Sequence, residues 1–102
     1  MRRRIVYAPE AEAQLIDLYR YIELQASPAI AQGFTEAIVA RCSALAEFPD
    51  RGTPREDLLP GLRTVAFRRR VTIAYWVDAE AVMILGIFYG GQDFESVFQD
   101  DG

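Results

Sequence analysis

Histidine and lysine are both absent from this sequence of 102 residues, and all 11 of its basic residues are arginines. Histidine is the side chain whose unperturbed pKa lies closest to neutrality, and lysine is the one that burial most readily shifts towards it. Arginine stays protonated and cannot replace either one as a general base. The composition therefore weighs against acid–base catalysis and against an enzyme.

Cysteine and long apolar runs are scarce as well. Cys42 is the single cysteine, so no intramolecular disulfide can form, and without histidine it gives no zinc site. The basic start is followed only by Ile-Val-Tyr-Ala before Pro9, which is short of the roughly 7 to 15 apolar residues of a signal peptide. Residues 81–91, the longest uncharged apolar run, fall well below the roughly 20 residues of a membrane span. We expect a cytoplasmic chain without membrane segment, metal, cofactor or small-molecule substrate.

The net charge of −4 and the sequence pI of about 4.7 argue against a protein that coats nucleic acid with a broad basic surface. Any contact with nucleic acid has to be local. The length predicts one domain spanning residues 1–102, because a second hydrophobic core would not fit.

Two helices are predicted in the first half of the chain. Residues 3–7 form a β-branched and aromatic run that ends before Pro9, which predicts a strand and then a helix start. Apolar residues at three-to-four spacing predict a helix over residues 10–26, with Ala11, Leu15, Leu18, Ile22 and Ala26 on one face. Ser27 and Pro28 predict the cap and first turn of a second helix, whose apolar face comprises Ile30, Phe34, Ile38, Cys42 or alternatively Val39, Leu45 and Phe48. The short link between them predicts an antiparallel hairpin.

The second half predicts strands. Residues 48–61 contain three prolines and two glycines and are predicted to be a loop. Residues 62–67, 71–77 and 81–89 are strand-like, with tight connections at residues 68–70 and 78–80, and residues 94–98 can add a helical turn. The middle strand is apolar on both sides and should be central, with Tyr75 and Trp76 in the core. The prediction is an α+β domain with a helical hairpin on one face of a mainly antiparallel sheet.

Five segments in order resemble the RelE/ParE family of toxins from bacterial toxin–antitoxin pairs. They read YAPEAEAQLIDLYRYIELQASPAIAQGF, FPDRGTPR, GLRTV, TIAYWVD and VMILGIFYGGQD, and together they span residues 7–93. The resemblance implies a RelE/ParE-like fold and a small cytoplasmic toxin, of the kind linked to plasmid stabilisation. It also implies a cognate antitoxin, ParD-like or other, that wraps the toxin in a hetero-oligomer. Members similar to RelE cleave messenger RNA in the ribosome, whereas members similar to ParE poison DNA gyrase without cutting anything themselves.

The last strand departs from the family pattern. Many members carry a motif similar to ILRVLHGRRD where this chain reads ILGIFYGGQD, so arginines and a histidine are replaced at Gly86, Tyr89, Gly91 and Gln92. Cleavage of RNA needs cations at the scissile phosphate together with an acid and a base. The losses favour a ParE-like gyrase poison. The alternatives are a ribosome-dependent endonuclease using Arg63, Arg68, Arg70 and Tyr89, or a degenerate, non-toxic antitoxin-binding member.

Two surfaces are candidates for function. Residues 62–77 hold four arginines and no acid, which predicts either a solvated hairpin connection or a cationic surface for a target or antitoxin. That candidate surface comprises Arg63, Arg68, Arg69, Arg70, Tyr89, Asp93 and Phe94. Tyr19, Tyr21 and Phe34 are either packing residues or, if one edge of the helical hairpin stays exposed, a groove for an antitoxin helix. Cys42 is predicted to be a small core residue and not a nucleophile.

Overall fold

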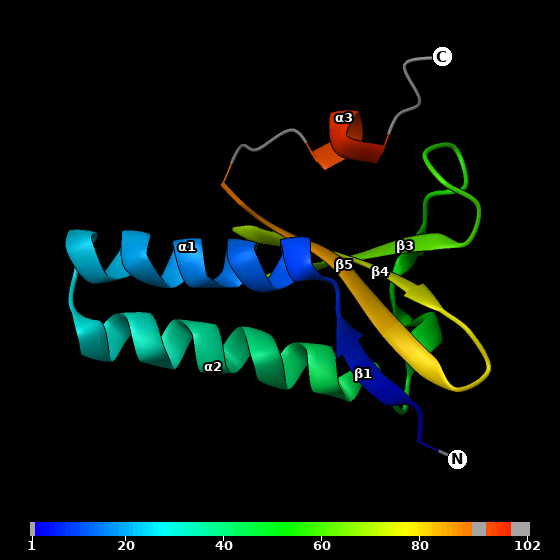
Figure 1. Cartoon of the computed structure of the whole chain (residues 1–102), viewed down its shortest axis with the longest axis horizontal. Helices are drawn as coiled ribbons and strands as arrows, with labels where there is room; N and C mark the ends of the chain where they lie inside the picture. Colours follow the sequence, from blue (N-terminus) through cyan, green and yellow to red (C-terminus); the bar gives the residue numbers. More distant parts are fainter. Residues whose placement is uncertain (1, 91–93, 99–102) are drawn as a thin grey trace.

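The computed structural model describes residues 2–90 and 94–98. Along the chain lie β1 (Arg4–Tyr7), α1 (Pro9–Gln25), α2 (Pro28–Ala44), the 3-10 helix η1 (Pro49–Arg51), β2 (Thr53–Pro54), β3 (Leu62–Phe67), β4 (Val71–Val77), β5 (Ala81–Tyr89) and α3 (Phe94–Phe98) (Figure 1). The predicted order of the main helices and strands is confirmed. Within the described ranges, none of the helices combines the length and the apolar character that crossing a membrane would need.

The five strands form one mixed sheet in the order β1-β5-β4-β3-β2. β1 runs parallel to β5, with Arg4 opposite Ala81, and the other neighbours are antiparallel. The central position predicted for β4 is therefore confirmed. β2 lies inside the segment predicted to be a loop, and it pairs only Thr53 and Pro54 with β3. A two-residue strand that ends in proline has no periodicity, so no sequence pattern predicts it.

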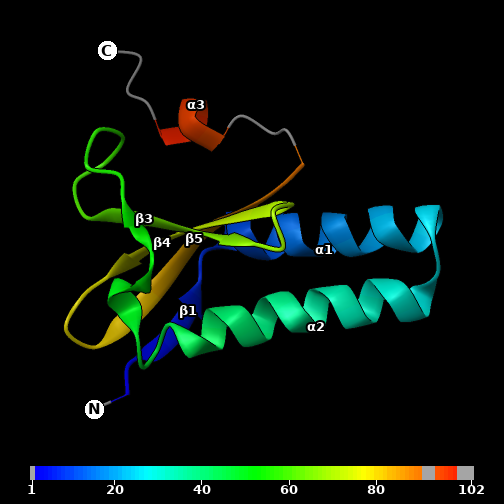
Figure 2. The ribbon, with the colours of Figure 1, turned by 180° about the vertical axis from the view of Figure 1, so that it is seen from behind.

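α1 and α2 lie side by side and are joined at one end, as predicted (Figures 1 and 2). The hydroxyl of Ser27 accepts a hydrogen bond from the amide of Ile30 at 3.1 Å, which caps α2. Two predictions for α2 are wrong, since Ile30 and Phe48 are mostly exposed. Ile30 lies in the first turn of α2, and Phe48 follows the end of the helix at Ala44.

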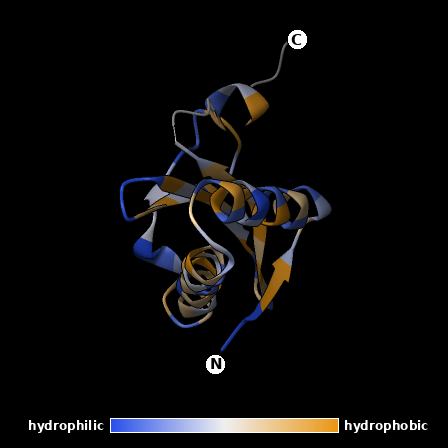
Figure 3. Cartoon of the chain, turned by 90° about the vertical axis from the view of Figure 1, so that its left-hand side faces the viewer, coloured by the Kyte–Doolittle hydropathy of each residue, from blue (hydrophilic) through white to orange (hydrophobic). Residues whose placement is uncertain are grey.

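Apolar side chains cover both faces of the sheet. The larger core lies between the sheet and the helical hairpin and includes Leu18, Ile38, Ile73 and Ile84. A smaller cluster of Leu62, Ala74 and Phe88 lies on the other face, where Leu58, Leu85, Phe94 and Phe98 pack against it. Figure 3 views the hairpin end-on, with α3 set apart from both long helices. The helical hairpin thus covers one face, while α3 covers part of the other.

Trp76 differs from its predicted place in the core. Tyr75 is fully buried as predicted, but Trp76 is 40% exposed. Its indole lies against Gly61, where a Cβ would come within 2.5 Å of the indole nitrogen. The loop backbone therefore covers only part of the ring, and the rest faces solvent.

Candidate functional site

The connection between β3 and β4 holds Arg68, Arg69 and Arg70, hereafter the arginine triplet. Arg68 and Arg69 have positive φ angles of 50° and 58°, and the amide of Arg70 donates to the carbonyl of Phe67 at 3.0 Å. Positive φ at both central residues is the pattern of a type I′ turn, which normally takes asparagine and glycine. The left-handed conformation costs roughly 1 kcal/mol for each such residue. The turn thus keeps two arginines where the backbone disfavours them.

Aromatic rings from four elements, α1, α2, β3 and β5, gather beside this turn. The guanidinium carbon of Arg68 lies 4.9 Å from the ring centroid of Phe67 and 5.8 Å from that of Phe34. The centroid of Phe34 is 5.5 Å from Phe67 and 6.3 Å from Tyr89, and Tyr21 is 5.8 Å from Tyr89. These four rings, here called the aromatic cluster, connect the turn to α1, α2 and the end of β5. Gly90, directly after β5, holds the end of that strand against the turn, because its amide donates to the carbonyl of Arg70 at 2.7 Å.

An open hollow of about 460 Å³ runs along α1 beside this cluster. Gln14 crosses from α1 to β5, and its side-chain oxygen accepts from the amide of Ile87 at 2.7 Å. Tyr21 is 51% exposed at the rim. The hollow is lined by Gln14, Asp17, Leu18, Tyr21, Ile87, Tyr89 and Gly90.

The arginine triplet is exposed and forms no ion pair with the described part of the chain. All three of its residues are exposed. The ion pairs among residues 2–90 and 94–98 join Arg2 to Glu47 and Arg55 to both Asp57 and Glu95. No carboxylate in that part of the chain therefore lies within ion-pair distance of the triplet.

Arg63 does not join the triplet. It lies at the opposite end of β3, about 16 Å away for an extended strand. Its guanidinium donates to the carbonyls of Asp50 and Gly52, each at 2.9 Å. The Tyr75 hydroxyl meets the same segment, accepting from the Gly52 amide at 2.9 Å and donating to the Pro49 carbonyl at 2.7 Å. Arg63 and Tyr75 thus brace η1 against the sheet.

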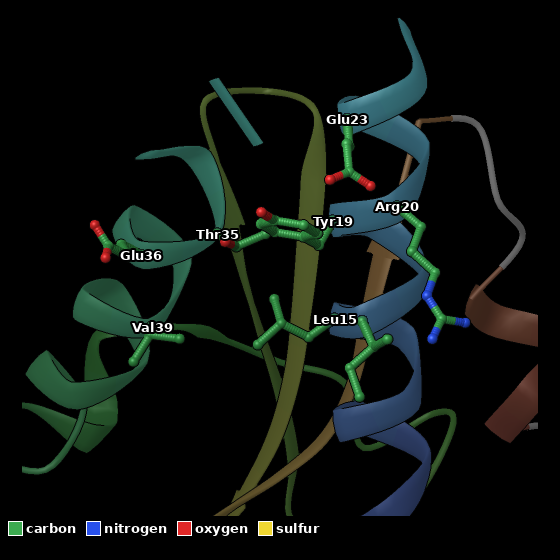
Figure 4. Close-up of a pocket in the computed structure, with 8 residues that line it drawn as sticks. Leu15, Tyr19, Arg20, Glu23, Thr35, Glu36 and Val39 are labelled. Atoms are coloured by element: carbon green, nitrogen blue, oxygen red, sulfur yellow. The ribbon is translucent and has the colours of Figure 1, made fainter. Parts of the chain in front are cut away.

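The three aromatics of the predicted antitoxin groove separate into two groups. Tyr21 and Phe34 belong to the aromatic cluster, whereas Tyr19 lines a second hollow, of about 480 Å³, between α1 and α2 (Figure 4). We call it the interhelical hollow; it is lined by Leu15, Ile16, Tyr19, Arg20, Glu23, Thr35, Glu36 and Val39. Ile16 and Val39 are exposed there, which leaves the hollow with an open apolar surface.

Phe94 lies on the other side of the sheet from the aromatic cluster. Its ring centroid is 5.9 Å from that of Phe88, and the guanidinium carbon of Arg55 is 5.7 Å from it. Arg55 also bonds Glu95 at 2.6 Å, which ties α3 to the loop before β3. Asp93 lies outside the described residues.

Two residues of the site, Phe67 and Gln14, were not predicted from the sequence. Phe67 has the pattern of an ordinary strand residue, and its cation–π contact with Arg68 arises from the fold of the turn. Gln14 gave no signal, because its partner Ile87 is 73 residues away along the chain.

The pKa shifts at the described groups all lead away from neutrality. Burial raises the pKa of Cys42 to about 11, and burial together with the neighbouring Cys42 thiol raises the pKa of Tyr7. Hydrogen bonds from Arg55 lower the pKa of Asp57. The bonds to Asp57 and Glu95 in turn raise the pKa of Arg55. Two backbone amides of the β4–β5 turn lower the pKa of Asp78. None of these five shifts moves a pKa towards neutrality, which is the usual direction for a general acid or base.

The fold is that of a bacterial toxin from a toxin–antitoxin pair. Among solved structures the chain is similar to a chromosomal ParDE TA system from P. aeruginosa, with a TM-score of 0.75 and 22% identity over 86% of this chain and 96% of that one. The family model for the ParE toxin of the type II toxin–antitoxin system parDE matches residues 5–94, and the chain belongs to that family. No curated protein matches it. The predicted family and fold are thereby confirmed.

Proposed function

We propose that this protein is a non-enzymatic, cytoplasmic toxin that poisons DNA gyrase and that a cognate antitoxin neutralises. Membership of the ParE family supports the toxin role. The observation that carries the non-enzymatic part is the composition, because the sequence contains neither histidine nor lysine. Poisoning by binding needs a shaped surface and no proton transfer, so it suits a chain without histidine or lysine.

The arginine triplet and the aromatic cluster are the proposed working surface of the toxin. The triplet is exposed, and no carboxylate among residues 2–90 and 94–98 forms an ion pair with it, which supports this assignment. The positive φ angles of Arg68 and Arg69 support it too, since strained backbone conformations gather at functional sites. A strand connection without a functional role would be expected to contain asparagine and glycine, which a type I′ turn prefers.

The interhelical hollow is the proposed docking site for the antitoxin. An amphipathic helix binds by laying apolar anchors into such a groove, and Ile16, Tyr19 and Val39 offer an apolar surface for them. The toxin and antitoxin would then form a hetero-oligomer in which the working surface lies apart from this contact. Replacing Ile16 or Val39 with aspartate should weaken antitoxin binding and leave toxicity unchanged.

A supercoiling and DNA-cleavage assay with purified toxin and gyrase tests the proposed target. We expect reduced supercoiling and accumulation of cleaved DNA, with both effects reversed by the antitoxin. Unaffected gyrase would overturn the proposal. New ends in translated messages, mapped by primer extension, would then identify a RelE-like endonuclease, and harmless overexpression would identify a degenerate member.

A further inference from the structure

We propose that the arginine triplet and the aromatic cluster bind single-stranded nucleic acid directly. Arg69 and Arg70 would contact phosphates, and the ring of Tyr21 would stack under one unpaired base. This goes beyond the proposed function, which requires only a protein target, and it does not depend on gyrase.

The charge at the turn is suited to a phosphodiester backbone. The guanidinium group forms paired hydrogen bonds with phosphate oxygens. Arg68 already faces two aromatic rings, Phe34 and Phe67, which fixes the turn in place. Arg69 and Arg70 are exposed, and no carboxylate of the described chain pairs with them. Since the net charge is −4, the attraction has to come from this local arrangement and not from the protein as a whole.

The tyrosines beside the triplet supply a stacking surface. Tyr21 is 51% exposed, and its ring meets that of Tyr89 at an interplanar angle of 55°. Bases stack on such rings whatever their identity, because each base has a π face. The adjoining hollow of about 460 Å³ provides room for a base next to Tyr21.

An acidic peptide would use only part of this site. Its carboxylates would satisfy the arginines but leave the tyrosine ring without a partner. Asp17, which lines the same hollow, would repel a phosphate as well as a peptide carboxylate, but it can accept a hydrogen bond from the amino group of cytosine or adenine. Cations, a ring and one acceptor together match a nucleotide better than a peptide.

Fluorescence anisotropy with labelled oligonucleotides of about 12 residues, a length typical of such sites, tests the proposal. The arms are single-stranded DNA, single-stranded RNA of the same sequence, and duplex DNA, each over a series of salt concentrations. The duplex should bind more weakly than the single strands, because its bases are not free to stack. A preference between the DNA and RNA arms identifies the source of the strand.

Three variants locate the site. The double variant Arg69→Gln, Arg70→Gln should reduce the slope of log K against log salt by about 1.4, since each lost contact with a single strand removes about 0.7. Tyr21→Leu should weaken binding by on the order of tenfold, with Tyr21→Phe close to wild type, because the phenyl ring retains the stacking face. The control is Arg2→Gln, Arg4→Gln, which removes the same charge near the N-terminus and should leave the slope unchanged.

Circular dichroism and thermal unfolding of each variant establish that it is folded before it is compared. Equal losses in the triplet variant and the N-terminal control would overturn the proposal, because they would reflect net charge alone. Binding that is absent in every arm would overturn it as well. Unchanged nucleic-acid binding together with weaker antitoxin binding in the triplet variant would instead identify a peptide site. No arm contains gyrase, so failure here leaves the gyrase proposal to its own test.

Discussion

The guanidinium of Arg68 packs on the ring of Phe34, with 5.8 Å between the guanidinium carbon and the ring centroid, and thereby joins the β3–β4 turn to α2. The sequence placed these two residues on separate candidate surfaces, Arg68 on a cationic surface for a target or antitoxin and Phe34 in a groove for an antitoxin helix. Their contact combines them into one site. The turn is held by this contact and by the bond from Gly90, so Arg69 and Arg70 project from a fixed support.

Arg69 is predicted to lower the stability of the turn and to support toxicity. Arg69→Gly should raise the free energy of unfolding by up to about 1 kcal/mol, because glycine adopts positive φ without steric cost. The same change should weaken toxicity through the loss of one exposed cation. Urea denaturation and a growth assay measure the two effects.

The neighbouring residue provides the control for this prediction. Arg70 is not among the residues with positive φ, so Arg70→Gly should lower the free energy of unfolding by about 0.5 to 1 kcal/mol. Equal and same-signed changes at both positions would contradict the account of the turn.

Gly86 is predicted to be required by Phe88. A Cβ at this position would lie 2.5 Å and 2.6 Å from two ring carbons of Phe88, so Gly86→Ala should cost about 2 kcal/mol of stability. The double variant Gly86→Ala, Phe88→Leu should be destabilised by about 1 kcal/mol less than the sum of the two single variants, because leucine leaves space for the added methyl group. Strict additivity in urea denaturation would contradict this explanation. The contact also gives a structural reason for the absence of the arginine that many members carry at this position.

Ionisation of the Cys42 thiol should lower the free energy of unfolding at alkaline pH. Burial raises the pKa of its thiol from an ordinary value of about 9 to about 11, so the neutral form is favoured in the folded state. That contribution is complete below about pH 9 and is lost as the pH rises through about 11, a change of roughly 2 to 3 kcal/mol. Cys42→Ala should be less stable at pH 7 but should decline less steeply above pH 9 in urea denaturation. An unchanged alkaline slope in the variant would assign the loss to other groups, such as Tyr7.

Arg63 should matter for stability and not for toxicity. Arg63→Met removes two hydrogen bonds to carbonyls near η1, which should cost about 2 kcal/mol. The toxic effect per folded molecule should stay at the wild-type level, in contrast to substitutions in the triplet. A stable Arg63→Met protein that has lost toxicity would place Arg63 in the working surface after all.

The sequence predicted the elements that bury long periodic faces. Helices with residues such as Leu18 and Ile38 inward, and a central strand that is apolar on both sides, are specified by spacing alone. β2 and η1 escaped prediction because they are held by distant partners such as Tyr75 and Arg63. The same applies to the site. Spacing identified the arginines and tyrosines, but only the contacts of the folded chain show that Tyr21 meets Tyr89 while Tyr19 lines the interhelical hollow. The same holds for the bonds from Arg63 to the carbonyls of Asp50 and Gly52.

The most direct test of the central claim is the amount of cleaved DNA that gyrase accumulates with purified, antitoxin-free toxin. Wild type and the Arg2→Gln, Arg4→Gln control should trap cleaved DNA to the same extent, whereas Arg69→Gln, Arg70→Gln should trap little. That result would establish the arginine triplet as part of the surface that poisons gyrase. Normal supercoiling and no cleaved DNA with the folded wild-type protein would contradict the account.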